Sequence, residues 1–222
     1  MQDQYLFRYL LLFSIFISCV NADEKYSLRL AGGEASLSNL NQILSLKNEY
    51  HPDSMMVYGV DAGYLLLKDT FDWPLDIYLK SAFYYYPEKG TYYQTNASLP
   101  TYGNKYVQDD IFEGIIYVKA YWNFNFWKNR VRLGVSEGIS YVSDIPLVER
   151  QEADFDNDNT SRVLNYLELS IDFDVGRLIR YKPMEDFYAG FFIKHRSGIF
   201  GLINGVEEGG NNYLMLSLEK NF

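Results

Sequence analysis

Residues 163–175 read VLNYLELSIDFDV and alternate between apolar and polar side chains over most of their length. One parity is apolar and consists of Val163, Leu167, Leu169, Ile171, Phe173 and Val175. The other parity is polar and consists of Tyr166, Glu168, Ser170, Asp172 and Asp174. Because successive side chains of a strand point to opposite faces, this stretch predicts a strand with one apolar face and one charged face.

The same alternation recurs along the chain. Further apolar rows predict strands at residues 56–66, 75–85, 111–126, 131–141, 187–197 and 213–222. A shorter strand is predicted at residues 26–31. Together with 163–175 these segments give eight strands, an even number at the small end of the range for membrane barrels.

The connection lengths separate a membrane barrel from a water-soluble sandwich, in which the charged faces would simply lie outside. Short connections are predicted at residues 68–74, 125–130 and 176–185, and long ones at 32–54, 87–109, 144–161 and 200–210. This strict alternation is typical of barrels with tight periplasmic turns and larger external loops. After residue 22 no segment approaches the roughly 18 to 20 apolar residues that a spanning helix requires. We therefore predict an all-β fold, an eight-stranded antiparallel up-and-down transmembrane β-barrel formed by residues 23–222.

The last predicted strand ends in an aromatic residue. Its apolar face carries Leu214, Leu216, Leu218 and Phe222. A terminal Phe that closes an alternating strand resembles the signature of outer-membrane proteins that the barrel-assembly machinery reads, although Lys220 stands where an aromatic residue is commoner. The resemblance implies that this machinery is a partner of the chain.

The N-terminal segment predicts export. Arg8 precedes the apolar run 9–20, and Val20-Asn21-Ala22 provides the small-residue pattern that a signal peptidase cleaves. We therefore expect residues 1–22 to be a signal peptide and the mature protein to reside in a bacterial outer membrane. The alternative is a lipoprotein attached at Cys19.

Composition excludes several classes of function. The formal net charge is −9 and no basic run is present, which argues against nucleic acid as a partner. Cys19 is the only cysteine and lies in the predicted signal peptide, so disulfides, thiol catalysis and cysteine-ligated metals are not expected in the mature chain. The 21 Tyr and 15 Phe suit membrane interfaces, where one end of a ring meets hydrocarbon and the other meets water.

An acidic loop raises the question of calcium. Asp154, Asp156 and Asp158 are spaced as calcium ligands, but the glycine and the closing glutamate of an EF-hand are missing. A solvated loop, bridged to lipopolysaccharide phosphates by divalent ions, is the preferred interpretation, and no resident cofactor or metal is expected. His51, in the first long connection, has no partner that the sequence identifies.

The polar parities predict a packed barrel interior. Their charges are expected to pair as the filling of a narrow barrel rather than to form a pore or a catalytic centre; they are Glu113, Lys119, Glu168, Asp172, Asp174, Lys194 and Arg196. Glu137 is the exception because it falls on an apolar parity. Either a bulge near Gly138 turns it inward or the register differs there.

Chemistry is predicted at the end of the strand at residues 187–197. Its apolar parity runs through Phe191 and Ile193 and then continues with His195 and Ser197. Side chains two residues apart on a strand are separated by roughly 6.6 Å and point the same way, so the imidazole could activate the serine hydroxyl. Glu207 or Glu208 in the following loop could orient the imidazole. The competing interpretation is a pair of ordinary polar residues at the membrane interface.

The stretch His195-Arg196-Ser197-Gly198, followed by Glu207, Glu208 and a final strand, resembles the lipid A 3-O-deacylase (PagL) family over about the last forty residues. Members of that family are exported eight-stranded barrels with a lipid-facing His-x-Ser pair on the penultimate strand. The resemblance implies Ser197 as nucleophile, His195 as base and either glutamate as the orienting acid. The family usually has Asn after the serine, where this chain has Gly198. Backbone N–H groups near Gly198, or the side chain of Asn204, are the candidates for the oxyanion hole.

These features predict an outer-membrane esterase without a cofactor, which removes an ester-linked acyl chain from lipid A of lipopolysaccharide in the outer leaflet. One alternative is a non-enzymatic barrel, an adhesin or structural protein, whose acidic loops bind a partner. Another is a different lipid enzyme, a phospholipase or an acyltransferase.

Overall fold

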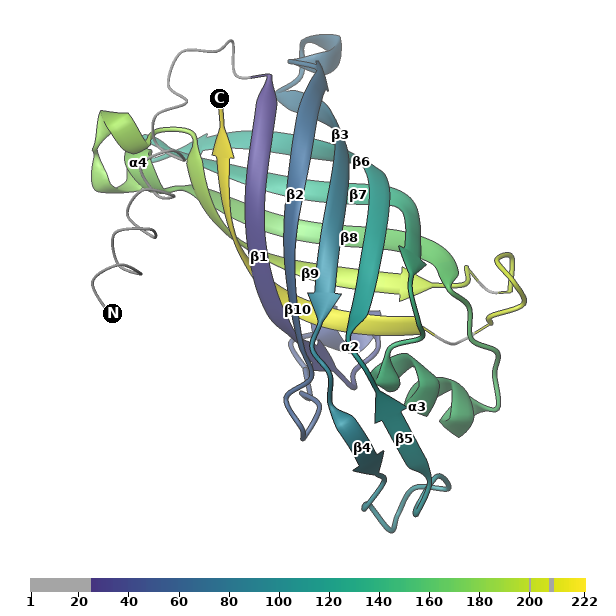
Figure 1. Cartoon of the computed structure of the whole chain (residues 1–222). Helices are drawn as coiled ribbons and strands as arrows, with labels where there is room; N and C mark the ends of the chain where they lie inside the picture. The colour runs from purple at the N-terminus through teal and green to yellow at the C-terminus, as the bar shows by residue number, and fades with distance from the viewer. Residues whose placement is uncertain (1–24, 200, 208–209) are drawn as a thin grey trace, which may run out of the picture.

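The computed structural model describes residues 25–199, 201–207 and 210–222; the predicted signal peptide, Cys19 and Glu208 lie outside the described residues. Eight strands in the described part close into a barrel in the order β1-β10-β9-β8-β7-β6-β3-β2, with every neighbouring pair antiparallel (Figure 1). They are β1 (Tyr26–Ser36), β2 (Met56–Leu67), β3 (Leu75–Tyr86), β6 (Ile111–Phe126), β7 (Asn129–Val142), β8 (Val163–Asp174), β9 (Phe187–Ser197) and β10 (Gly210–Asn221). The predicted fold class is confirmed.

The two rims of the barrel differ. The rim with the short connections, here called the turn rim, carries α4 (Val175–Ile179) and two 3-10 turns, η1 (Thr70–Asp72) and η2 (Lys182–Met184). The opposite rim, the loop rim, carries α2 (Leu40–Leu44), α3 (Leu147–Asp156) and the hairpin of β4 (Gly90–Tyr93) and β5 (Lys105–Gln108). Figure 1 shows α4 and the end of β10 at one rim, and α3 with the hairpin at the other. No helix within the described residues is long and apolar enough to cross a membrane.

The first strand is longer than the sequence predicts. The prediction ends it at Ala31, whereas β1 continues through Gly32 and Gly33 to Ser36. A Cβ atom at Gly33 would lie 2.2 Å from the carbonyl oxygen of Leu214 on β10. Gly33 therefore permits a close approach of two strands and does not begin a loop.

The strand β8 ends one residue earlier than predicted, for a reason that its last residue supplies. The side chain of Asp174 accepts a hydrogen bond of 2.9 Å from the backbone N–H of Arg177. This is an N-cap, so Val175 begins the helix α4 and does not continue the strand.

The outer wall of the barrel is apolar and has aromatic residues near both rims. At the turn rim the ring of Tyr26 lies 5.4 Å from that of Tyr64 and 6.3 Å from that of Phe222. Tyr26 and Phe222 also exchange two backbone hydrogen bonds of 2.9 Å, which continue the pairing between the first and last strands. Toward the loop rim Phe83 stacks on Phe112 at 5.7 Å. Lys220 faces outward on β10 and donates to the carbonyl oxygen of Glu185 at 2.7 Å.

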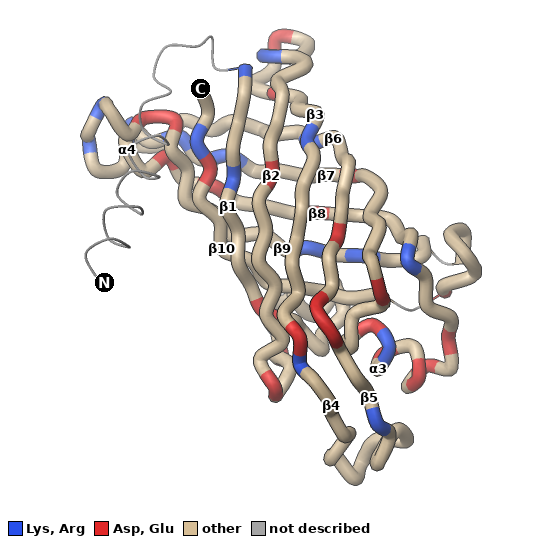
Figure 2. Tube along the Cα trace, in the orientation of Figure 1, with Lys and Arg blue, Asp and Glu red and all other residues tan. Residues whose placement is uncertain are grey.

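The barrel interior is filled by paired charges and tyrosines, as the alternation predicts. Arg29 contacts Asp61 and lies 2.7 Å from Glu168. Lys80 lies 3.0 Å from Asp61 and 2.8 Å from Glu219. Further buried pairs join Lys119 to Glu168, Arg132 to Asp172 and Glu219, Lys194 to Glu113, and Arg196 to Glu113 and Glu149. Figure 2 shows charges of both signs along the strands of the wall as well as in the connections. Opposite charges thus neutralise one another among the buried side chains that fill the lumen.

The segments at the loop rim pack on one another. Leu147 and Val148 of α3 are buried in the same apolar cluster as Tyr106 of β5. His51, for which the sequence identifies no partner, is buried with its Nε2 3.0 Å from Oε1 of Gln151 on α3. Its ring lies 5.9 Å from that of Tyr92 on β4. Burial lowers the pKa of His51, and the hydrogen bond to Gln151 partly offsets this effect. His51 therefore joins the first long connection to the hairpin and to α3.

The position of Glu137 differs from both explanations that the sequence analysis gives for it. Neither a bulge nor a shift of register occurs near Gly138, because β7 pairs continuously with β6 and with β8. Glu137 lies opposite Val118 on one side and Leu167 on the other. Its side chain is exposed and points outward from the apolar wall.

Candidate functional site

Polar side chains interrupt the apolar outer wall across four neighbouring strands near the loop rim. We call these residues the outer seam; they are Glu137 on β7, Asn165 on β8, His195 and Ser197 on β9, and Asn212 on β10. The orientation of β9 follows from its alternation, since Lys194 and Arg196 are completely buried in the interior and bonded there to Glu113. His195 and Ser197 therefore point outward.

The strand register places the members of the seam next to one another. His195 lies directly opposite Asn212 of β10, and Ser197 lies directly opposite Asn165 of β8. Directly opposed residues have Cβ atoms about 4.5 to 5.5 Å apart, so their side chains are within reach of each other. Glu137 is farther away, because Leu167 pairs with Glu137 on one side and with His195 on the other.

The contacts of Asn212 determine the tautomer of His195. The Asn212 amide nitrogen donates to the carbonyl oxygen of Ser38 at 3.1 Å. Its oxygen is thereby turned toward His195 and lies 2.8 Å from the imidazole Nδ1. Because an amide oxygen can only accept, Nδ1 carries the proton and Nε2 keeps a free lone pair. This is the tautomer that a general base requires.

The serine hydroxyl lies on the same face as the imidazole but is not bonded to it. Among the described residues, His195 and Ser197 share no hydrogen bond. Both side chains are partly exposed. Hydrogen bonds between a nucleophile and its base are often long or unformed in the absence of substrate. The arrangement can therefore serve nucleophilic catalysis once the serine side chain rotates toward Nε2.

The helix α2 covers the β10 side of the seam. Asn39 caps this helix by accepting from the backbone N–H of Gln42 at 2.9 Å, and Gln42 returns a bond to the Asn39 N–H at 3.0 Å. Ile43 of the helix packs on outward-facing Ile193 and Leu214. An apolar wall thus stands beside His195.

Of the other predicted site residues, Gly198 and Asn204 belong to a compact loop. The carbonyl oxygen of Gly198 accepts from the backbone N–H of Ile203 at 2.9 Å. A Cβ atom at position 198 would lie 2.0 Å from the carbonyl oxygen of Val206, so the Asn typical of the PagL family would not fit here. The Asn204 amide donates to the Ser161 hydroxyl at 2.7 Å.

The structure does not bring the described loop glutamate to the imidazole. The backbone N–H of Glu207 donates to the carboxylate of Asp158 at 3.0 Å, and its side chain is exposed. Within the described part of the chain, Glu207 shares no hydrogen bond with His195, whose Nδ1 faces Asn212. Glu208 lies outside the described residues.

Sequence reasoning missed two members of the seam, although a signal for both was present. Asn165 sits on the apolar parity of β8, between Val163 and Leu167. Asn212 continues the apolar parity of β10 beyond Leu214, but the predicted strand begins only at Tyr213. An amide on a lipid-facing parity is the feature that would have identified them.

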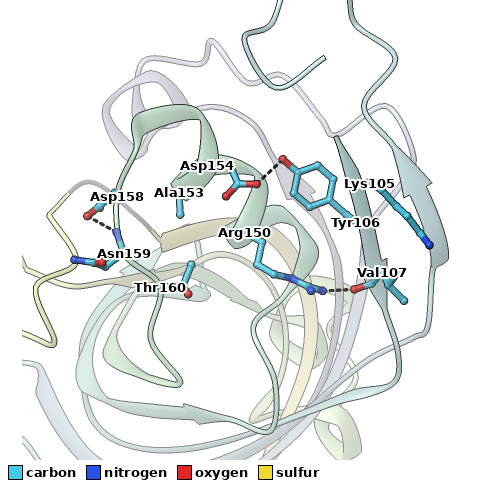
Figure 3. A pocket seen from close by; sticks show the side chains of 9 residues that line it. All are labelled: Lys105, Tyr106, Val107, Arg150, Ala153, Asp154, Asp158, Asn159 and Thr160. Atoms are coloured by element: carbon cyan, nitrogen blue, oxygen red, sulfur yellow. Dashed lines mark hydrogen bonds between the residues drawn. The ribbon is translucent and has the colours of Figure 1, made fainter. Parts of the chain in front are cut away.

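A pocket at the loop rim is separate from the seam. Its volume is about 580 Å³, and its lining includes Lys105 and Tyr106 of β5, Arg150 and Asp154 of α3, and Asn159 (Figure 3). The Tyr106 hydroxyl donates to Asp154 at 2.9 Å, and Arg150 donates to the carbonyl oxygen of Val107. Its polar groups thus bond to one another. Among the described residues, no group of three or more His, Cys, Asp or Glu side chains is placed to hold a metal ion.

Comparison with known proteins identifies the fold. No protein-family model matches the chain, and no curated protein sequence matches it. The crystal structure of the outer membrane enzyme PagL is similar with a TM-score of 0.52 and 11% identity, covering 88% of this chain and 99% of PagL. Neisserial surface protein A gives a TM-score of 0.44 at 13% identity, with 91% and 99% coverage. The N-terminal β-barrel domain of Pseudomonas aeruginosa OprF gives 0.42 at 14%, with 89% and 98% coverage. The closed eight-stranded barrel of this chain is therefore similar in fold to that of the outer membrane enzyme PagL.

Proposed function

We propose that the chain is an outer-membrane serine esterase that removes an ester-linked acyl chain from lipid A in the outer leaflet. The observation that supports this best is the outward-facing imidazole of His195. Asn212 holds it with Nε2 unprotonated, two residues before Ser197 and on the wall that meets acyl chains. The His-x-Ser pair on the penultimate strand resembles the PagL family, and PagL has a similar fold.

The proposed reaction needs only these side chains and water. The Ser197 oxygen bonds to the ester carbonyl carbon while its proton passes to Nε2 of His195. The bond from that carbon to the sugar oxygen then breaks, and the sugar oxygen takes the proton back from the imidazolium. A water molecule then gives a proton to His195 and bonds to the acyl carbon, the bond from that carbon to the Ser197 oxygen breaks, and the serine oxygen takes the proton from the imidazolium as the fatty acid leaves.

Asn212 takes the place of an acidic triad member in this proposal. Its amide orients the imidazole as a carboxylate would, but it carries no charge to stabilise the imidazolium. Asn212 therefore stabilises the imidazolium less than a carboxylate would. Export by residues 1–22, insertion by the barrel-assembly machinery and contact with lipopolysaccharide belong to the same proposal.

The test compares lipid A by mass spectrometry from cells that carry wild type, Ser197→Ala, Ser81→Ala or an empty vector. Ser81 is an exposed, outward-facing serine on β3, across the barrel from β9, and serves as the matched control. Wild type and Ser81→Ala should yield lipid A that lacks one acyl chain, and Ser197→Ala should not. Spectra from wild type that equal those of the empty vector would reject the proposal and leave a non-enzymatic barrel. Release of fatty acid from labelled phospholipid would instead indicate a phospholipase.

A further inference from the structure

The side-chain amide of Asn165 lies in an unusual environment for a polar group. It faces outward on β8, with apolar Val163 and Leu167 on the same face and Ile139 opposite it on β7. Only 9% of its surface is exposed. Within the described residues its side-chain amide has no hydrogen-bonding partner in the protein. Its amide atoms are therefore unbonded but not sealed off from the outside of the wall. Because the neighbouring side chains are apolar, a ligand at the outer wall is the natural recipient of its hydrogen bonds.

The position of Asn165 indicates which ligand atom it would meet. It is the direct cross-strand partner of Ser197, on the face of β8 and β9 that carries the proposed nucleophile. When Ser197 attacks an ester, the carbonyl oxygen becomes an oxyanion within two bonds of the serine oxygen. A donor on the neighbouring strand, at the same level as the serine, is placed to reach that oxygen.

The side chain that sequence reasoning offered for this role is engaged elsewhere. The Asn204 amide donates to the Ser161 hydroxyl at 2.7 Å and to the carbonyl oxygen of Val163 at 3.3 Å. The position after the serine is Gly198, which has no side chain and no room for one. Asn212 uses its amide nitrogen on Ser38. Asn165 is the amide of the seam whose donor is free.

We propose that Asn165 binds the oxyanion that forms when Ser197 attacks the acyl ester, so that a side chain from the adjacent strand replaces the Asn found after the serine in the PagL family. This inference rests on the proposed esterase function. Asn165 acts through its amide N–H groups, which stabilise the negative charge in the transition state more than the neutral carbonyl of the bound ester. It therefore contributes to kcat more than to KM.

The test uses the full-length barrel in lipid bilayers, with lipid A as substrate, and compares wild type with Asn165→Ala, Asn165→Asp and Ser197→Ala. Removal of one oxyanion donor lowers kcat by roughly 10²- to 10³-fold, and KM should change by less than about threefold. Asn165→Asp keeps the shape and an acceptor oxygen but lacks the N–H donor and adds negative charge. It should be at least as impaired as Asn165→Ala.

Leu167→Ala, on the same face of the same strand, is the control for packing and should keep kcat within about threefold of wild type. Heat-modifiable migration on gels verifies that each variant forms the barrel. The proposal is overturned if Ser197→Ala abolishes activity while Asn165→Ala retains it, or if Asn165→Asp stays active while Asn165→Ala does not. Failure of the esterase proposal is recognised separately, because wild type then releases no fatty acid or Ser197→Ala remains active.

Discussion

Polar side chains on the inner and outer faces of the barrel wall differ in their hydrogen-bonding partners. On the inside, Glu168 is completely buried and accepts hydrogen bonds from Arg29, Lys119 and Tyr166. On the outside, Asn165 has no partner among the described residues, although it is nearly as well covered. Charged side chains inside the barrel form ion pairs with one another, whereas the outer seam includes an amide, that of Asn165, that is bonded to no other described residue. An unpaired amide on an apolar wall is therefore a candidate for function, and the ion pairs inside the barrel point to stability.

The largest expected effect is the loss of a paired charge inside. Glu168→Gln leaves Lys119 without its carboxylate and Arg29 with only Asp61, so the free energy of unfolding should fall by about 3 to 5 kcal/mol. Urea titration of the barrel in lipid bilayers measures this, with the folded fraction taken from heat-modifiable migration. The control is Glu137→Gln, in which an exposed, outward glutamate is changed in the same way. A loss below about 1 kcal/mol for Glu168→Gln would show that the interior charges do not depend on one another.

Most of the fold could be predicted from the sequence, because the face of each strand residue follows from its parity alone. Every barrel strand lies where alternation places it, including β8 with its apolar row up to Phe173. The errors arose where local signals compete with tertiary contacts. Gly32 and Gly33 are typical of turns but lie in β1, since the close approach of β10 leaves no space for a Cβ atom at Gly33. The hairpin and α3 were missed because long connections lack a clear periodicity.

The candidate site could be predicted only along a single strand. His195 and Ser197 share β9, so their common face follows from a spacing of two residues. Their neighbours Asn212 and Asn165 come from other strands, and which residues meet across strands depends on register, which the sequence does not specify by itself. The orientation of the imidazole also depends on the carbonyl of Ser38, in a connection far away along the chain.

Glu152 on α3 allows the comparison of paired and unpaired polar groups to be tested at the loop rim, where α3 meets the interior. Within the described residues this side chain has no hydrogen bond or ion pair. Burial, together with nearby Asp156 and Glu149, raises its pKa to about 8. A docked α3 therefore favours the protonated carboxyl. The contribution of the protonated Glu152 carboxyl to docking of α3 is fully present below the usual carboxyl pKa near 4.3. It is lost as the pH rises from there to about 8.

We expect docking of α3 to weaken by about 2 kcal/mol between pH 5 and pH 8, an amount reduced because the carboxyl remains partly accessible to water. Hydrogen exchange of α3 amides, expressed as protection factors so that the intrinsic pH dependence cancels, measures this change. Glu152→Gln should remove it. The strand β8 provides the internal control, since its protection should be unchanged over the same range. A pH-independent α3 in wild type would mean that Glu152 is solvated.

Asn212→Ala tests whether the outer seam positions the imidazole. Without the acceptor for Nδ1–H the imidazole is free to rotate and to change tautomer, and kcat should fall by about tenfold, the equivalent of one hydrogen bond. Leu214→Ala, the next outward residue of β10, removes packing without changing the hydrogen bond and should keep most of the activity. The rates of fatty acid release from lipid A give both values. Equal losses of kcat in the two variants would show that Asn212 acts through packing and not through its hydrogen bond to the imidazole.

Glu137→Leu gives the smallest effect and defines where the functional part of the seam ends. A carboxylate on the apolar wall is unfavourable, so its replacement should raise the free energy of unfolding by about 1 kcal/mol in the urea titration. Because Leu167 stands between Glu137 and His195, fatty acid release should remain within about threefold of wild type. A gain in stability together with a large loss of activity would extend the site to β7. The carboxylate of Glu137 would then contact the substrate, as proposed for the amide of Asn165.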